Sequence, residues 1–361
     1  MLSRVADSLY WMSRYIERAE NIARILDVNL QLLLDLPTLD PKRRNALWEP
    51  VLRATGDAFE FYQQYEVATP EHVMEYLILN EKNSNSIQHC INAARENARH
   101  VRETISVEMW EELNRVYLDL KHVTMDDIER QTPSEFFKFI KDGSHLFQGI
   151  TDATMMHGEG WEFIQTGKFL ERADKTTRML DANEEVLLPH EKKGKVREPL
   201  MLNAILRSCS AETGYRRTYP GYVESDKVVD FLVLNEFFPR SVRFCVYSLD
   251  DSLHRISGAK DEHFTNQAEK LSGRLISEII YSTVDDILGR GIHDYIDELQ
   301  MKLNSIGSAM ATTYMAYSEE AAASPAADAK PAEAKSASAP ATTTLPASNQ
   351  SQATAAKAVV A

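Results

Sequence analysis

A segment of thirteen residues occurs twice in this chain, and the repeat constrains the fold more than any other feature. Tyr15–Asp27 returns as Phe169–Asp181 at an offset of 154 residues, with six identities and four conservative replacements. Motifs that recur at a fixed offset indicate repeated structural units. The sequence therefore predicts an internal duplication, with a first half at residues 1–158 and a second at 159–320.

A second motif repeats in the same order. Val73–Glu81 aligns with Val228–Glu236 at an offset of 155, and both segments end in Leu-Asn-Glu. Two motifs at nearly one offset favour duplication over chance. We expect the halves to pack on each other as one compact unit.

The hydrophobic pattern is helical. From Val5 to Leu33, apolar or small residues recur at alternating steps of four and three, which is the seam of a long helix packed on other helices. Charged residues make up 26% of the chain and glycine only 14 of 361 positions, which suits an all-α protein. The sequence predicts an all-α helical bundle. Its main expected helices are 3–35, 43–62 (interrupted at Pro50), one that begins at Thr69-Pro70 and runs through Ile91, 107–121, and one from a capping box at Thr132–Glu135 to about residue 157, before a break at Gly158 and Gly160.

The composition changes at Ala321. Residues 321–361 are rich in alanine, proline, serine and threonine and contain no aromatic residue. Such a segment buries too little apolar surface to offset its conformational entropy. We expect a disordered C-terminal tail that is dispensable for folding.

The repeated segment places charges beside the helix seam. One arc holds three carboxylates and an arginine in each copy: Glu17, Glu20, Arg24 and Asp27 in the first, and Glu171, Asp174, Arg178 and Asp181 in the second. Arg18 and Arg172 lie on the other flank, without an acid three or four residues away. Each must find its anion on another helix or on a ligand.

The Leu-Asn-Glu motifs offer such acids. Asn80 and Asn235 fall on the expected seams, each followed by a glutamate, Glu81 or Glu236. A buried asparagine must be hydrogen-bonded and can fix helix register, which is the structural interpretation. The alternative is a polar centre in which Glu81 and Glu236 pair with the two arginines, since buried ionic groups persist when paired. That centre is either purely structural or also holds an anionic or peptide ligand.

Two further segments carry candidate binding residues. Ala94–Arg99 loosely repeats the charged arc and supplies Arg95 and Arg99. Tyr215–Tyr222, read as a loop, surrounds Arg216 and Arg217 with tyrosines. Such loops contact carboxylates, phosphates or partner proteins, although tyrosine packing alone also explains the segment.

Several classes of function find no support in the sequence. A net charge of −14 argues against a nucleic-acid-binding surface. We expect neither a metal nor a cofactor, because Asp251-x-x-His254 stands alone and the chain has no Gly-x-Ser-x-Gly or Gly-rich phosphate loop. Three scattered cysteines, no signal peptide and no apolar stretch long enough to cross a membrane indicate a cytoplasmic protein without membrane contacts.

The paired Glu-Arg-Ala-Glu/Asp motifs, the segment Ala94–Glu103 and the doubled Leu-Asn-Glu resemble the bacterial alpha-E family, an all-helical domain named for its Glu-Arg motif. The resemblance covers about residues 1–318 and assigns the motif to Glu17-Arg18 and Glu171-Arg172. It implies association with circularly permuted ATP-grasp proteins, which join a carboxylate to an amine, and with transglutaminase-like or peptidase proteins of the same system.

Two functions remain open. The first is a non-catalytic, accessory partner of an ATP-grasp-type peptide or amide ligase. The second is an enzyme in its own right, a transferase or hydrolase that uses the duplicated Glu/Asp-Arg centre on a peptide-like or anionic substrate. The missing pair of nucleophile and base favours the first.

Overall fold

The first helix begins and ends where the hydrophobic pattern predicts. In a computed structural model, which describes residues 1–188, 198–260 and 263–316, helix α1 spans Ser3–Asp35. Leu9, Met12, Ile16 and Ala19 on its seam are fully or almost fully buried. The helix ends at Asp35, and Leu36 is its non-helical C-cap, because the residue that precedes a proline, here Pro37, is disfavoured in the helical conformation.

The rest of the first half consists of helices of unequal length. Their bounds are α2 (Pro41–Ala46), α3 (Glu49–Thr55), α4 (Ala58–Tyr62), α5 (Pro70–Ile78), α6 (Ile87–His100), α7 (Val107–Leu120), α8 (Met125–Gln131) and α9 (Pro133–Thr154). Three of them, α6, α7 and α9, are long, and the others are short.

The second half contains a similar series. It consists of α10 (Glu159–Ala182), α11 (Glu184–Leu187), α12 (Glu198–Ser208), α13 (Glu212–Thr218), α14 (Ser225–Leu234), α15 (Val242–Ser257), α16 (Gln267–Tyr281), α17 (Val284–Arg290) and α18 (Ile292–Met310), followed by a π-helical turn at Ala311–Met315. No strand occurs among the described residues, so the fold is all-α.

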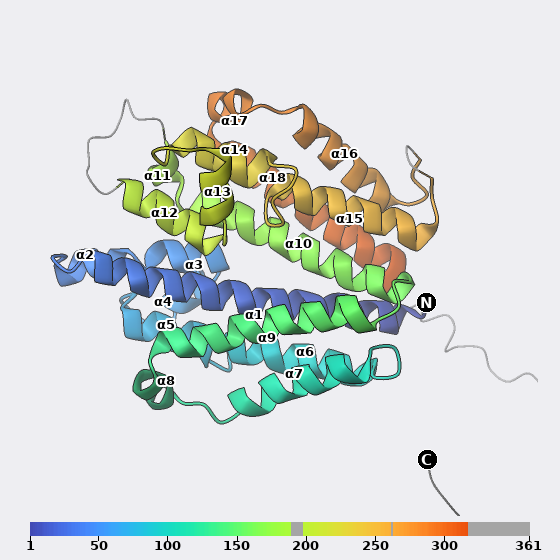
Figure 1. The fold of residues 1–361 in the computed structure, drawn as a ribbon, viewed down its shortest axis with the longest axis horizontal. Helices are drawn as coiled ribbons and strands as arrows, with labels where there is room; N and C mark the ends of the chain where they lie inside the picture. The colour runs from blue at the N-terminus through green and yellow to red at the C-terminus, as the bar shows by residue number, and fades with distance from the viewer. Residues whose placement is uncertain (189–197, 261–262, 317–361) are drawn as a thin grey trace, which may run out of the picture. The chain divides into compact units, whose positions relative to one another are not determined.

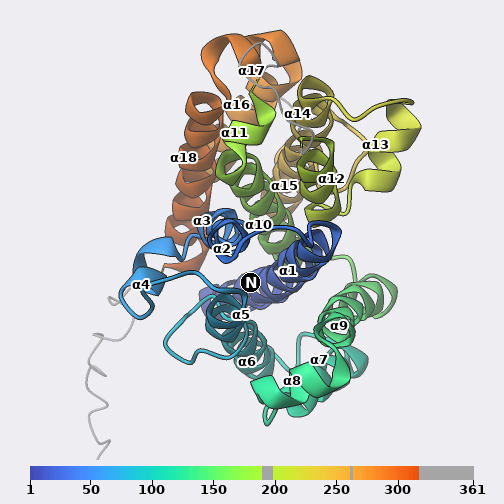
Figure 2. The same ribbon diagram turned by 90° about the vertical axis from the view of Figure 1, so that its left-hand side faces the viewer.

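Each half packs four long helices around its own core. In the first, α1 contacts α6 and α9, and α7 closes the group against both; in the second, α10 contacts α15 and α18, and α16 closes that group. The long helices α1 and α10 lie side by side at the middle of the molecule (Figures 1 and 2). The two halves therefore meet through the helices that carry the repeated motif. Common ancestry of the halves stays a prediction from the sequence.

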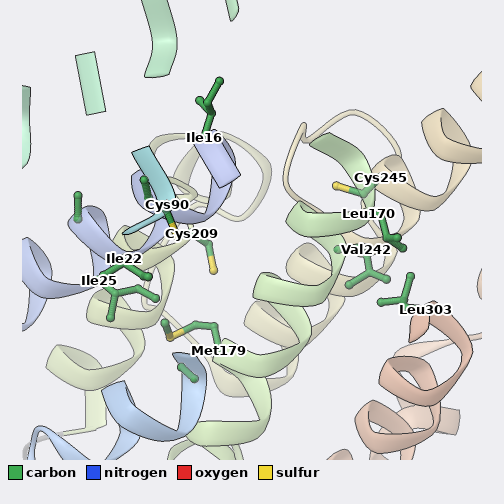
Figure 3. Packing of buried hydrophobic residues seen from close by; sticks show 14 of the residues in the cluster. Ile16, Ile22, Ile25, Cys90, Leu170, Met179, Cys209, Val242, Cys245 and Leu303 are labelled. Carbon is green, nitrogen blue, oxygen red and sulfur yellow. The ribbon is translucent and has the colours of Figure 1, made fainter. Parts of the chain in front are cut away.

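Short helices cross between the halves. Helix α3 of the first half packs on α10, and α12 of the second half packs on α1. One continuous cluster of buried apolar side chains runs through both halves, including Ile22 and Ile25 near Met179 and Cys209 (Figure 3). The helices from Ser3 to Met310 accordingly belong to one compact unit.

Several expected helix boundaries are wrong. The helix that begins at Pro70 ends at Ile78, and a turn separates it from α6, so Asn80 lies outside any helix. The expected helix 43–62 consists of α2, α3 and α4 with turns between them. These segments are too short for hydrophobic periodicity to locate the turns.

The expected start of α9 is also incorrect in its details. Thr132 has a φ of 85° and forms no side-chain cap, whereas Thr124 and Asp127 form a capping box at the start of the unpredicted helix α8. Gly158 caps α10, and Gly160 lies inside it rather than in a break.

No helix among the described residues has the length and hydropathy needed to cross a bilayer. The predicted C-terminal tail, residues 321–361, lies outside the described residues.

Candidate functional site

The repeated motifs lie on two helices that run parallel and in register. Tyr10 of α1 is adjacent to Gly167 of α10, where an added Cβ would lie 2.4 Å from the Tyr10 carbonyl oxygen. Further along both helices, Ile25 and Met179 line one small cavity. Glycine at 167 thus permits a close approach of the two helices, and the approach brings each Glu-Arg pair opposite the other.

Glu171 of the second motif binds arginines of the first helix. Its carboxylate is completely buried and accepts hydrogen bonds from Arg18 Nε at 2.7 Å, Arg18 Nη2 at 3.2 Å and Arg14 Nε at 2.8 Å. Lys175 Nζ lies 3.5 Å away. Arg18 also donates to Asn85 Oδ1 at 2.9 Å, at the start of the α6 region.

Glu17 of the first motif binds cations of the second half. It accepts from Arg172 Nε at 2.8 Å and from Arg240 Nη1 at 2.5 Å, and its side chain is 1% exposed. Gln148 of α9 joins the two residues, because its amide nitrogen donates to Glu17 at 3.0 Å and its oxygen accepts from Arg172 at 2.7 Å.

The two contacts are reciprocal. Arg18 pairs with the glutamate of the second motif and Arg172 pairs with the glutamate of the first, an arrangement that we call the Glu-Arg lock. The prediction that each arginine binds a carboxylate from another helix is confirmed. The nominated acids are wrong: Glu81 and Glu236 are exposed, and Glu236 pairs with Arg243.

The neighbouring arginines keep the two glutamates of the lock ionised. Burial alone would raise the pKa of Glu17, but the guanidinium groups of Arg172 and Arg240 lower it below its usual range. Burial opposes ionisation of Glu171 in the same way, and Arg18 and Arg14 lower its pKa well below the usual value. Both carboxylates are therefore ionised at neutral pH and cannot act there as proton donors.

The arcs beside the lock extend it along both helices. Glu20 Oε2 accepts from Arg24 and from Arg240, each at 3.0 Å, while Asp174 accepts from Arg178 at 2.9 Å and Lys175 at 3.1 Å. The last arc residues contact other helices of their own halves. Asp27 binds Ser134 and Lys141 of α9, and Asp181 binds His293 of α18.

The Leu-Asn-Glu motifs form turns rather than the polar centre. Asn80 follows α5 and Asn235 follows α14, and both are half-buried. Each side-chain oxygen accepts a backbone N–H two residues later, from Lys82 or Phe237, at 2.9 Å. Such Asx turns are a common role of asparagine between helices. The hypothesis that these residues meet Arg18 and Arg172 is wrong.

The remaining candidates also lie away from the lock. Arg95 sits over the Tyr117 ring at 4.5 Å and donates to Asn114, and Arg99 pairs with Glu96, all on the α6–α7 surface. The segment read as a loop is largely helix α13. On it, Arg216 pairs with Glu212, and Arg217 is exposed.

The sequence analysis did not identify four residues that take part in the lock: Arg14, Asn85, Gln148 and Arg240. Arg240 stands where the second motif's offset of 155 places the equivalent of Asn85, so the two positions correspond without sharing chemistry. The offset itself could have located this position. Gln148 has no counterpart in the repeat, and no signal in the sequence marks it.

Other reactive groups are either buried or dispersed. Burial raises the pKa of the Cys90 and Cys245 thiols to about 12 and that of Cys209 to about 11. No group of three or more potential metal ligands occurs in the part of the chain that the structure describes. Within that part, Asp251 pairs with Arg255, and the ring of His254 contacts two backbone carbonyls.

Comparison with known families matches most of the sequence to a named domain. Residues 1–315 match the model of Alpha-E, described as a predicted alpha-helical domain with a conserved ER motif. The chain belongs to the Alpha-E family. Glu17-Arg18 and Glu171-Arg172 are Glu-Arg pairs within the matched residues, and in this Alpha-E protein they form the Glu-Arg lock.

The chain is also similar to longer mycobacterial proteins. An uncharacterised protein of Mycobacterium bovis is 24% identical over 274 residues, and one of Mycobacterium tuberculosis is 23% identical over the same length. The match covers 71% of this chain but 30% of each relative, so this Alpha-E chain spans less than a third of their length. No solved structure matches it.

Proposed function

We propose that this Alpha-E protein is a non-catalytic helical partner of an ATP-grasp-type ligase that joins carboxylates to amines. The partnership comes from the family resemblance. Transglutaminase-like or peptidase proteins of the same system are further candidate partners. The non-catalytic role comes from the contacts of the motif that names the family.

The Glu-Arg lock carries this proposal. Its two glutamates bind three arginines of the motif helices and Arg240, all within 3.2 Å. A catalytic acid or base requires a pKa near the working pH and access to substrate. Glu17 and Glu171 have lowered pKa values and no exposed surface beyond 1%. Residues in this condition hold helices together rather than perform proton transfer.

The greater length of the mycobacterial relatives supports the proposal that the Alpha-E domain acts together with other domains. In both mycobacterial proteins the matching region is 30% of the chain. A domain that is joined to other segments in one protein can act on a separate chain in another. This is the relationship that we propose for the ligase.

The alternative, an enzyme that uses the Glu/Asp-Arg centre, would require the lock to open. Glu17 or Glu171 would have to leave its arginines and expose several buried cations. Breaking a buried ion pair costs about 3–5 kcal/mol. A substrate would have to supply that free energy before any chemistry began.

Co-purification and turnover test the proposal together. The tagged full-length chain is purified from its native host, and the bound proteins are identified and counted. We expect an ATP-grasp protein in stoichiometric amount. ADP release by that protein with its substrates should rise when the chain is added, and the chain alone should release none. Amide formation or hydrolysis by the chain alone, with no ATP-grasp protein bound, would contradict the proposal and support the enzyme.

A further inference from the structure

A small polar cavity opens where α1, α9 and α10 meet. Ser13 and Ile16 line it from α1, Gln148 from α9, and Gln165 and Lys168 from α10. Its volume is about 20 Å³, which accommodates one group the size of a water molecule. The cavity lies beside the lock, because Gln148 contributes to both.

Three polar side chains of this cavity have no partner among the described residues. Ser13 is 6% exposed and Gln165 is 5% exposed, and neither forms a side-chain hydrogen bond with another described residue. Lys168 is half-buried and forms neither a hydrogen bond nor an ion pair there; its ammonium lies 4.5 Å from the centre of the Phe169 ring. The polar atoms of these three side chains retain some access to solvent, so they are available to a water molecule or a ligand group in the cavity.

The corresponding positions of the first half carry larger side chains. At the offset of 154, Trp11 corresponds to Gln165 and Arg14 to Lys168. Arg14 donates to Glu171 and to the Tyr10 hydroxyl, and its guanidinium lies 4.8 Å from the centre of the Trp11 ring. Smaller side chains replace these in the second half, which leaves both space and an unpaired cation.

The charge around the cavity favours an anion. The nearest acid, Glu17, is already bound by Arg172 and Arg240. Burial and, to a smaller extent, the nearby Arg172 lower the pKa of Lys168 to about 8, while Glu17 and Asp152 oppose the shift. Cys245, the other titratable group near it, is a buried neutral thiol.

We propose that this cavity binds the carboxylate group of a ligand, with Lys168 as the cation and Ser13 and Gln165 as hydrogen-bond donors. One carboxylate oxygen fills the cavity, and the second remains at its mouth beside Lys168. The carboxylate belongs either to a free small acid or to the C-terminus of a peptide.

Titration with acetate tests the site. Binding is followed by calorimetry or NMR at pH 7, with chloride at equal ionic strength as the reference. Wild-type protein should bind acetate saturably, and Lys168→Met should weaken binding at least about tenfold, since a hydrogen bond to a charged group is worth about 1.5–3 kcal/mol. Lys138→Met is the matched control. Lys138 is an exposed α9 residue paired with Asp142, so its loss should leave the affinity unchanged.

Further measurements distinguish loss of the binding site from a folding defect and identify the source of the carboxylate. Gln165→Leu keeps the volume and removes the amide, and it should also weaken binding. Raising the pH from 7 to 9 should reduce acetate affinity in wild type, because Lys168 loses its charge. Tighter binding of a short peptide with a free C-terminus than of its amidated form assigns the site to chain ends; equal weak binding of both assigns it to free acids. Absence of saturable acetate binding, or equal affinity in Lys168→Met, overturns the inference. Capture of the ligase is measured separately, so either proposal can fail alone.

Discussion

Glu171→Gln is the substitution that should damage this protein most for the smallest change in shape. The amide keeps the size of the side chain but removes the charge that faces Arg14, Arg18 and Lys175. These side chains are 17%, 14% and 9% exposed, so solvent compensates little. Arg14 and Arg18 would remain in the interior without their carboxylate partner, and Lys175 would keep only Asp174.

The expected cost follows from that geometry. Removal of one partner from a buried ion pair costs about 3–5 kcal/mol, and Glu171 serves two arginines at 2.8 and 2.7 Å. Domains are stable by only about 5–15 kcal/mol, so this variant should lose a large share of its stability. Glu236→Gln is the control. Its exposed pair with Arg243 at 3.0 Å is worth about 0–1 kcal/mol.

Urea unfolding followed by circular dichroism measures both variants. The pH dependence provides a second readout. Because the folded-state pKa of Glu171 lies below the unfolded value, its stabilisation is present above about pH 4.5 and is lost as the pH falls further. Wild type should weaken steeply in that range, and Glu171→Gln should weaken less. A loss below about 1 kcal/mol at pH 7, equal to that of Glu236→Gln, would refute the reasoning.

Three further predictions concern the helix contact, the cavity and the tail. Gly167→Ala should lower the melting temperature clearly, because its Cβ would lie 2.4 Å from the Tyr10 carbonyl oxygen, whereas Gly149→Ala, with no atom within 4 Å, should stabilise the protein by about 0.5–1 kcal/mol in urea titrations. Equal effects would contradict the close helix approach. Since the folded-state pKa of Lys168 lies below its unfolded value, wild type should gain unfolding free energy relative to Lys168→Met as the pH rises from about 8 to 10; a constant difference would be evidence against a perturbed amine. Removal of residues 321–361 should leave the melting temperature within a few degrees, and a larger drop would show that the tail packs.

The sequence predicted the long helices well and the short ones poorly. The seam of α1 repeats over 33 residues, long enough for its period to determine both the helix and its buried face. Around Asn80 the apolar steps of four and three continue across a turn, so the pattern alone favoured one helix. The asparagine side chain's bond to the Lys82 backbone decides the turn, and hydrophobic periodicity does not detect that bond.

The candidate site was predicted in part for a similar reason. The absence of local acids near Arg18 and Arg172 correctly required acids from another helix. It could not identify them, because that depends on how α1 and α10 align. Because the two helices pack parallel and in register, the two copies of the motif face each other, and the glutamate of each copy binds the arginine of the other. Arg240 lies in a connection, and its equivalent in the first half is the uncharged Asn85, so the repeat did not mark it as a cation.

A double-mutant cycle between Arg18 and Glu171 tests the Glu-Arg lock most directly. Unfolding free energies are measured for wild type, Arg18→Met, Glu171→Gln and the double variant. Residues in direct contact show coupling of about 0.5–3 kcal/mol, and the bidentate contact at 2.7 and 3.2 Å places this pair near the upper end. The lock predicts that the double variant loses less than the sum of the single losses by about 2 kcal/mol. Losses that add within about 0.5 kcal/mol would show that the two motifs do not hold each other.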